Sequence, residues 1–161
     1  MMRVALFLLL TGLFSSGQGW QNNYDEPLNF KFPPGQSISY IMSKHHDFYE
    51  DRLWAFSCKP TINPSGDCFF SSYINNFDQA FSFACPPHYA IAGMNSYHSI
   101  FYEDRRWQFY CCRSSCISNN CQWTSHVNWF DETFFWNVPH HNVLVGAGSY
   151  HQDFYDNRRW R

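Results

Sequence analysis

The chain carries one short motif three times at a fixed interval. FYEDRLW occupies residues 48–54, FYEDRRW residues 101–107 and FYDNRRW residues 154–160, so each copy begins 53 residues after the one before. The same shift also superposes the asparagines that lie upstream of each copy: Asn22, Asn75 and Asn128. A repeat of this length indicates one supersecondary unit built three times. We place the units at residues 20–72, 73–125 and 126–161 of a single domain, 20–161.

The repeated segments have the two-residue period of β-strands. Arg52, Trp54 and Phe56 alternate with smaller or apolar neighbours, and no segment shows the 3.6-residue period of a helix. The sequence therefore predicts an all-β fold with three similar units arranged around a pseudo-threefold axis. A β-trefoil-like barrel is the first expectation, and a prism-like arrangement of three sheets is the alternative. Three units are too few for an open array without caps, which favours closure.

The first 19 residues have the layout of a secretory signal. Arg3 supplies the basic start, residues 4–14 form a short apolar run, and Gly17-Gln18-Gly19 resembles a small-residue cleavage site; cleavage before Gln18 is the alternative. The run is too short to span a bilayer, and no later stretch is apolar enough to do so. We expect a secreted protein without a transmembrane segment.

The composition argues for binding surfaces rather than for nucleic-acid contact. Without the signal the chain keeps 10 of its 11 basic residues against 13 acidic ones, and nucleic-acid binders usually show a basic excess. The 17 Phe, 10 Tyr and 7 Trp predict a core of large rings, with Tyr and Trp available for contact surfaces.

Seven cysteines in a secreted chain of this size indicate a disulfide framework, but the number is odd. The first two units run past their tryptophan to Cys58 and Cys112, whereas the third stops at Arg161. From this contrast we expect the sequence to be a fragment that lacks its C-terminus and at least one further cysteine.

The repeated D-R-x-W, followed in the second unit by WQFYCCR at residues 107–113, resembles the dermatopontin family. This family also contains invertebrate haemagglutinin and amebocyte aggregation factors. The resemblance covers nearly the whole mature chain. It implies a small extracellular protein that acts by adhesion or agglutination, without catalysis, and that binds sulfated glycosaminoglycans, proteoglycans or other matrix proteins.

The resemblance also implies part of a disulfide plan. It pairs Cys68 with Cys111 and Cys85 with Cys112. The expected partner position of Cys58 holds Phe32, so Cys58 is either free or paired between molecules. Cys116 and Cys121 would pair with cysteines beyond the end of this sequence, unless they join each other.

The repeated motif itself is interpreted mainly as scaffold. Alternation places each arginine on the face of its inward-pointing tryptophan, and a buried guanidinium needs an anion, which an acid of the same turn can supply. Stacking on the tryptophan would add a cation–π contact. The motif residues are Asp51, Arg52, Trp54, Asp104, Arg105, Trp107, Arg158 and Trp160. The functional alternative is an anion clamp.

The arginines that differ between copies are the candidate glycan-binding residues. Arg106 and Arg159 lie on the face opposite the tryptophan, where the first unit has Leu53, and Arg113 and Arg161 lie nearby in sequence. Their planar guanidinium groups suit sulfate and carboxylate. The alternative is solvated surface charge.

Histidines recur as His45, His98 and His151. A metal site is one interpretation, but no spacing such as HxxxH supports it, so we expect each histidine to bond within its own loop and no metal or cofactor to be bound. Tyr24 lies in an acidic context typical of tyrosine sulfation. Motifs of hydrolases, metalloproteases and phosphate-binding loops are absent from the sequence.

The sequence thus predicts a secreted adhesion or agglutination protein that binds sulfated glycans on cell surfaces or in matrix, with self-association as a further possibility. A defence lectin for neutral sugars and a structural protein that binds protein partners are the competing hypotheses.

Overall fold

The computed structural model describes residues 19–60, 64–115, 117 and 120–161. All its regular structure is β-strand. The strands are β1 (Leu28–Lys31), β2 (Gln36–His46), β3 (Asp51–Pro60), β4 (Pro64–Phe70), β5 (Phe81–Ala84), β6 (Tyr89–Ser99), β7 (Asp104–Ser114), β8 (Phe134–Asn137), β9 (Gly146–Gln152) and β10 (Asn157–Trp160). No helix in this part of the chain has the length and apolarity that crossing a bilayer requires.

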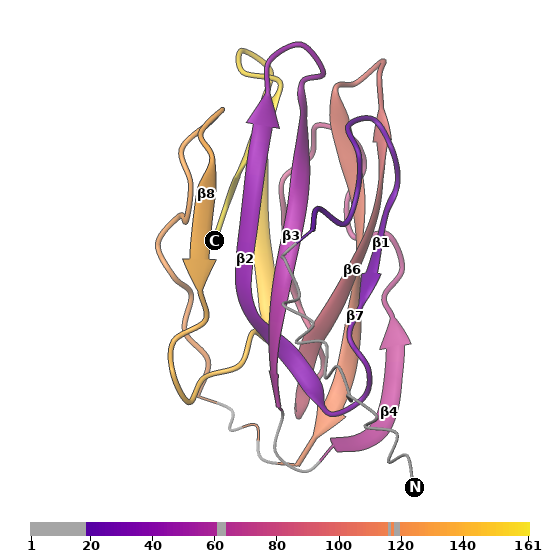
Figure 1. Cartoon of the computed structure of the whole chain (residues 1–161), viewed down its shortest axis with the longest axis vertical. Coiled ribbons are helices and arrows are strands. Elements are labelled where there is room, and N and C mark those ends of the chain that lie inside the picture. The colour runs from indigo at the N-terminus through magenta and orange to yellow at the C-terminus, as the bar shows by residue number, and fades with distance from the viewer. Residues whose placement is uncertain (1–18, 61–63, 116, 118–119) are drawn as a thin grey trace, which may run out of the picture.

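The strands form three antiparallel sheets, in the orders β1-β6-β7-β4, β10-β9-β5 and β3-β2-β8. Each sheet is built on one hairpin that contains a copy of the repeated motif: β2–β3, β6–β7 or β9–β10. Residues 47–50, 100–103 and 153–156 make the hairpin turns. The three turns lie at the same end of the elongated molecule, the upper end in Figure 1, which we call the tip end.

Each hairpin also pairs with a short strand that belongs to a different unit. β1 of the first unit pairs with β6 of the second, and β5 of the second pairs with β9 of the third. β8 of the third unit pairs with β2 of the first. The exchange ties every unit to both others through backbone hydrogen bonds.

Side-chain alternation along the hairpins explains how the sheets enclose a core. Trp54, Trp107 and Trp160 point inward and are 2%, 1% and 5% exposed, while the residues just before them point outward. The three indoles meet edge to face, with ring centroids 5.3, 5.3 and 4.8 Å apart. This arrangement is favoured by the aromatic quadrupole and fixes how closely the three sheets approach.

The all-β prediction is confirmed, with two disulfides joining strands and loops. The β-trefoil-like barrel is not confirmed, because the strands form three separate sheets rather than one closed barrel. The signal peptide prediction falls almost wholly on residues 1–18, outside the described residues. The unit and domain boundaries stay predictions.

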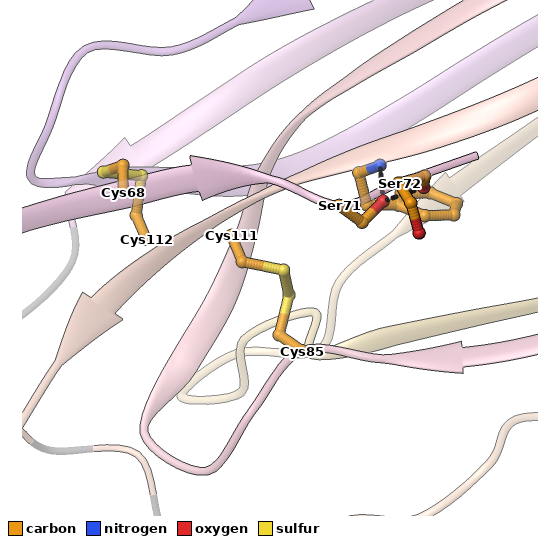
Figure 2. Close-up of a disulfide and its surroundings, with 7 residues drawn as sticks. Cys68, Ser71, Ser72, Cys85, Cys111 and Cys112 are labelled. Carbon is orange, nitrogen blue, oxygen red and sulfur yellow. Dashed lines mark hydrogen bonds between the residues drawn. A yellow bond between two sulfur atoms is a disulfide. The ribbon is translucent and has the colours of Figure 1, made fainter. Parts of the chain in front are cut away.

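The disulfide pairing implied by the resemblance was wrong. Cys68 pairs with Cys112 and Cys85 pairs with Cys111 (Figure 2). The β4–β7 register sets Cys68 directly opposite Cys112, with their Cα atoms 4.2 Å apart. Cys111 is fully buried and its side chain reaches Cys85 instead. Adjacent residues of a strand face opposite sides of the sheet, so the two cysteines need partners on opposite sides.

Two further cysteines have free thiols. Cys58 is exposed and its thiol donates a hydrogen bond to Gln36 Oε1 over 2.7 Å. Cys121 is exposed as well. Cys116 lies outside the described residues.

Candidate functional site

The arginines of the repeated motif are buried and paired, as expected, but their partners come from another unit. Arg105 donates from Nε and Nη2 to the two carboxylate oxygens of Asp51, each over 2.6 Å. Arg158 makes the same two bonds to Asp104, over 2.6 and 2.7 Å. The sequence had placed each acid and its arginine in one turn. The structure instead makes each pair a bond between two hairpins.

The third link differs because Asn157 stands where the other units have aspartate. Arg52 donates from Nε to Asn157 Oδ1 over 2.9 Å, and Asn157 Nδ2 donates to Asp131 Oδ1 over 2.9 Å. The amide therefore connects the buried guanidinium to a carboxylate farther out. Burial lowers the pKa of Arg52 to about 10, and the nearby carboxylates oppose that shift.

The guanidinium groups stack on phenylalanine rather than on the tryptophans predicted from the sequence. Arg52 lies 5.5 Å from the ring centroid of Phe134, and Arg158 lies 5.7 Å from that of Phe81. Phe134 is the first residue of β8 and Phe81 is the first residue of β5, and both strands pair with a hairpin of another unit. The stacking therefore adds to the contacts between units.

The asparagines that precede each motif copy have a structural role that sequence reasoning missed. In the second unit, Asn75 donates from Nδ2 to the carbonyl of Arg105 and accepts from the amide of Trp107, both over 2.9 Å. Asn22 and Asn128 make the equivalent bonds. The 53-residue spacing of these asparagines was the sequence feature that could have indicated this role.

The three repeated histidines are buried at the tip end, between carboxylates of two units. His98 Nδ1 lies 3.2 Å from Asp25 Oδ1, and His151 Nδ1 lies 3.6 Å from Asp78 Oδ1. His45 faces Asp131 and acids of its own turn. Burial lowers the pKa of His45 and of His98, with the neighbouring carboxylates opposing the shift. Each histidine therefore lies near an acid of another unit as well as acids of its own turn, whereas the sequence predicted contacts within its own loop only.

Carboxylates crowd around a small cavity at the tip end. Glu50, Glu103 and Asp156 line it together with the buried arginines and tryptophans, and its volume is about 30 Å³. Burial and the charges of Asp156 and other nearby acids raise the pKa of Glu50 to about 7. Of the residues that the structure describes, five acidic ones line this cavity, against three arginines.

The same end presents three exposed phenylalanines, one on each hairpin turn. Phe48, Phe101 and Phe154 are 81%, 83% and 83% exposed. Each touches only the edge of the tyrosine that follows it among the ring contacts of the described residues. They are the most exposed large apolar residues in that part of the chain.

Two of the predicted glycan-binding arginines are held alike on the outer faces of two sheets. Arg106 on β7 donates from Nε to the carbonyl of Asn75 over 2.9 Å and from Nη1 to Tyr97 Oη over 3.2 Å. Arg159 on β10 bonds to the carbonyl of Asn128 and to Tyr150 Oη over 3.0 and 3.3 Å. Within the described residues, Nη2 of each arginine makes no hydrogen bond.

Aromatic rings support both guanidinium groups from one side. Arg106 lies 5.0 Å from the ring centroid of Tyr73, and Arg159 lies 4.3 Å from that of Trp129. Arg113 is exposed farther along β7, and Arg161 follows β10 and stacks on Trp123. Arg106 and Arg113 therefore lie on β7, Arg159 lies on β10, and Arg161 directly follows β10.

A larger apolar cavity of about 620 Å³ went unrecognised at the sequence level. Trp136 of β8, Trp160, Leu144 and Cys121 are among the residues that line it. These residues are far apart in sequence, so no local pattern marked them. The volume is that of a site for a small apolar molecule.

Comparison with known proteins shows the family. The family model described as dermatopontin matches residues 22–161. The chain is 38% identical to a hemagglutinin/amebocyte aggregation factor of Limulus polyphemus over 98% of this chain and 92% of that protein. It is 34% identical to a dermatopontin of Biomphalaria glabrata, over 84% of this chain and 92% of that one. Human dermatopontin is 28% identical, over 87% of this chain and 67% of the relative.

The fold and the cross-unit arginine links define a disulfide-bonded β-protein made from three similar hairpins. The chain belongs to the dermatopontin family. No solved structure matches it.

Proposed function

We propose that this protein is a secreted, non-catalytic adhesion or agglutination protein that binds sulfated glycans of cell surfaces or matrix through its outer arginines. The observation that carries the proposal is the matched setting of Arg106 and Arg159. Each guanidinium is fixed by a carbonyl, a tyrosine hydroxyl and an aromatic ring, and each keeps Nη2 available.

A guanidinium held in this way suits a sulfate group. Charge-assisted hydrogen bonds from arginine to an anion are stronger than neutral ones. Because the side chain is already ordered, less conformational entropy is lost when the anion binds. Arg113, which is exposed, and Arg161 would supply further contacts with the sulfate groups of a longer glycan chain.

The arrangement on two sheets supports agglutination. Two separated contacts let one molecule join two glycan chains, and the second contact is strengthened by effective concentration. The relative from Limulus is named for haemagglutination and amebocyte aggregation. We carry that role to this chain as part of the proposal, together with an extracellular location, cleavage of residues 1–19 and one domain at 20–161.

We also infer that the three units are related by a pseudo-threefold axis through the tryptophan cluster. The cyclic strand exchange supports it, as do the arginine links, which recur from unit to unit. Such an arrangement presents equivalent outer faces around the molecule, of which the second and third carry the outer arginine.

The test is binding of the full-length protein to immobilised heparin and to neutral glycans at low and physiological salt. We expect binding to heparin that weakens as salt rises, since ions screen surface charges. Replacing both residues (Arg106→Ala with Arg159→Ala) should weaken it by at least about tenfold, a loss of about 1.4 kcal/mol. Lys44→Ala, which removes an exposed charge from β2, outside the proposed binding surface, is the matched control.

Unchanged heparin binding in the double variant would overturn the assignment of the surface. The competing lectin hypothesis rests on Trp129, which is 55% exposed beneath Arg159. It predicts salt-insensitive binding to particular neutral sugars that is lost in Trp129→Ala. Binding to neither glycan class would favour a protein partner.

A further inference from the structure

Three potential metal ligands converge at the tip end from three separate parts of the chain. Asp25 lies in the loop before β1, Asp51 begins β3, and His98 lies near the end of β6. One ligand atom from each residue lies within 4.8 Å of the others. Among the described residues, no other group of three histidine, cysteine or carboxylate side chains is this tight.

The imidazole of His98 is the feature that needs an explanation. Its side chain is 1% exposed, yet neither ring nitrogen has a hydrogen-bond partner among the described residues. Nδ1 lies 3.2 Å from Asp25 Oδ1, and Nε2 lies 3.7 Å from Glu103 Oε2. Buried polar groups are normally hydrogen-bonded, so the two unpaired nitrogens of this imidazole, held between carboxylates, leave it able to bind a further group.

We propose that Asp25, Asp51 and His98 bind one divalent transition-metal ion of the Zn²⁺ class. One imidazole nitrogen with two carboxylate oxygens is a ligand set that zinc accepts. Calcium is a poorer match because it prefers six to eight oxygen ligands. Asp25 and Asp51 bring two negative charges, one of which Arg105 already offsets, and the carboxylate of Glu103 lies 3.7 Å from the imidazole as a further nearby acid.

The surroundings orient the ligands. Arg105 holds both oxygens of Asp51, and the backbone amide of Asp25 donates to Asp51 Oδ2 over 2.9 Å. Asp51 Oδ2 accepts two of these bonds, whereas Oδ1 accepts only the one from Arg105 Nε, so Oδ1 keeps a lone pair with which it can coordinate. Outer hydrogen bonds of this kind fix ligand geometry in metal sites.

The other two units provide an internal comparison. In the unit that follows, His151 Nδ1 lies 3.6 Å from Asp78 Oδ1, and the cluster with Asp104 is less compact. In the third, His45 faces Asp131, but Asn157 replaces the buried aspartate. We therefore assign one site per molecule, between the first and second units.

The sequence had favoured no metal, because the histidines lack a ligand spacing. The lack of a short ligand spacing does not exclude this site, because its ligands are 26 and 47 residues apart in sequence and meet only through tertiary contacts. The site is also separate from the outer arginines. Its test is therefore independent of the proposed glycan binding.

The experiment is calorimetric titration of the full-length, chelator-treated protein with Zn²⁺, together with visible absorption spectra on adding Co²⁺. We expect one ion per chain and a Co²⁺ spectrum with nitrogen and oxygen ligands. Asp25→Asn should weaken binding by at least about tenfold, as loss of a ligand interaction does. The hydrogen bond from Asp25 to Asp51 Oδ2 is donated by the backbone amide of Asp25, so the variant keeps it.

Asp78→Asn is the matched control. Asp78 lies at the equivalent loop position, and its backbone amide donates a hydrogen bond to Asp104 Oδ2 as that of Asp25 does to Asp51. We expect this variant to bind Zn²⁺ like the parent. His98→Gln, checked for folding by circular dichroism, should lose the Co²⁺ spectrum. No binding by the parent, or equal losses in Asp25→Asn and Asp78→Asn, would overturn the proposal.

Discussion

At the scale of single residues, Asn157 shows how one substitution alters a repeated link. It accepts a hydrogen bond from Arg52, as Asp51 accepts from Arg105, but it brings no charge of its own. The side-chain amide of Asn157 donates a hydrogen bond to Asp131, and the carboxylate of Asp131 supplies the negative charge. A buried guanidinium without an anion lowers the stability of the fold. The hydrogen bonds from Arg52 to Asn157 and from Asn157 to Asp131 reduce this cost.

The buried links predict the outcome of two substitutions of one residue. Asp104→Ala should lower the free energy of unfolding by about 3–5 kcal/mol, because Arg158 would stay buried without its partner. Asp104→Asn should cost less, since an amide oxygen already serves as acceptor in the third link. Chemical denaturation measures both, with Asp67→Ala as control, because the Asp67 carboxylate is exposed and accepts a surface hydrogen bond from Tyr89 Oη. Equal losses for Asp104→Ala and Asp67→Ala would contradict the buried-link interpretation.

At the scale of elements, the exchanged strands depend on glycines in the hairpins they join. A Cβ atom on Gly93 of β6 would lie 2.4 Å from the carbonyl oxygen of Phe30 in β1, and one on Gly146 of β9 would lie 2.6 Å from that of Phe83 in β5. The first unit has Tyr40 at this position, where β2 pairs with β8 at Asn137. Only the first two of these exchanges therefore require glycine.

Gly93→Ala should accordingly destabilise the protein. The new methyl group would push β1 away from β6, and overpacking of this kind costs about 1–3 kcal/mol. Ser82→Ala, a change of similar size at an exposed position of β5, is the control. Thermal unfolding followed by circular dichroism measures the difference. A Gly93→Ala protein as stable as the control would mean that β1 is not packed as described.

At the scale of the whole molecule, charge and aromatic groups are divided between two kinds of surface. The tip end gathers carboxylates and the exposed phenylalanines, whereas the outer faces of two sheets carry ordered arginines. Agglutination needs contacts on different sides of one molecule. Under the proposed function, Arg106 on β7 and Arg159 on β10 would supply two such contacts.

Removing one outer arginine should therefore harm agglutination more than binding. Arg159→Ala leaves Arg106 in place, so its affinity for a short soluble heparin fragment should fall only modestly. Its agglutination titre on glycan-coated beads should fall by about tenfold or more, because avidity is lost with the second contact. A titre that falls only in proportion to the affinity would show that agglutination arises elsewhere, for example by self-association.

The sequence by itself determined the local features: three copies of one motif, strands with inward tryptophans, and arginines on opposite faces. These follow from periods of 53 and two residues, which need no long-range information. It also carried the dermatopontin resemblance, which the family comparison confirms.

Only the tertiary structure decided which residues meet. Asp51 bonds to Arg105 of the next unit rather than to its own turn, and the register of β4 selects Cys112 over Cys111. The separation into three sheets was fixed in the same way, by strands exchanged between units. A repeated sequence gives equivalent positions the same local preferences. It does not tell whether a partner lies in the same copy or in the next, because that choice depends on packing across the core.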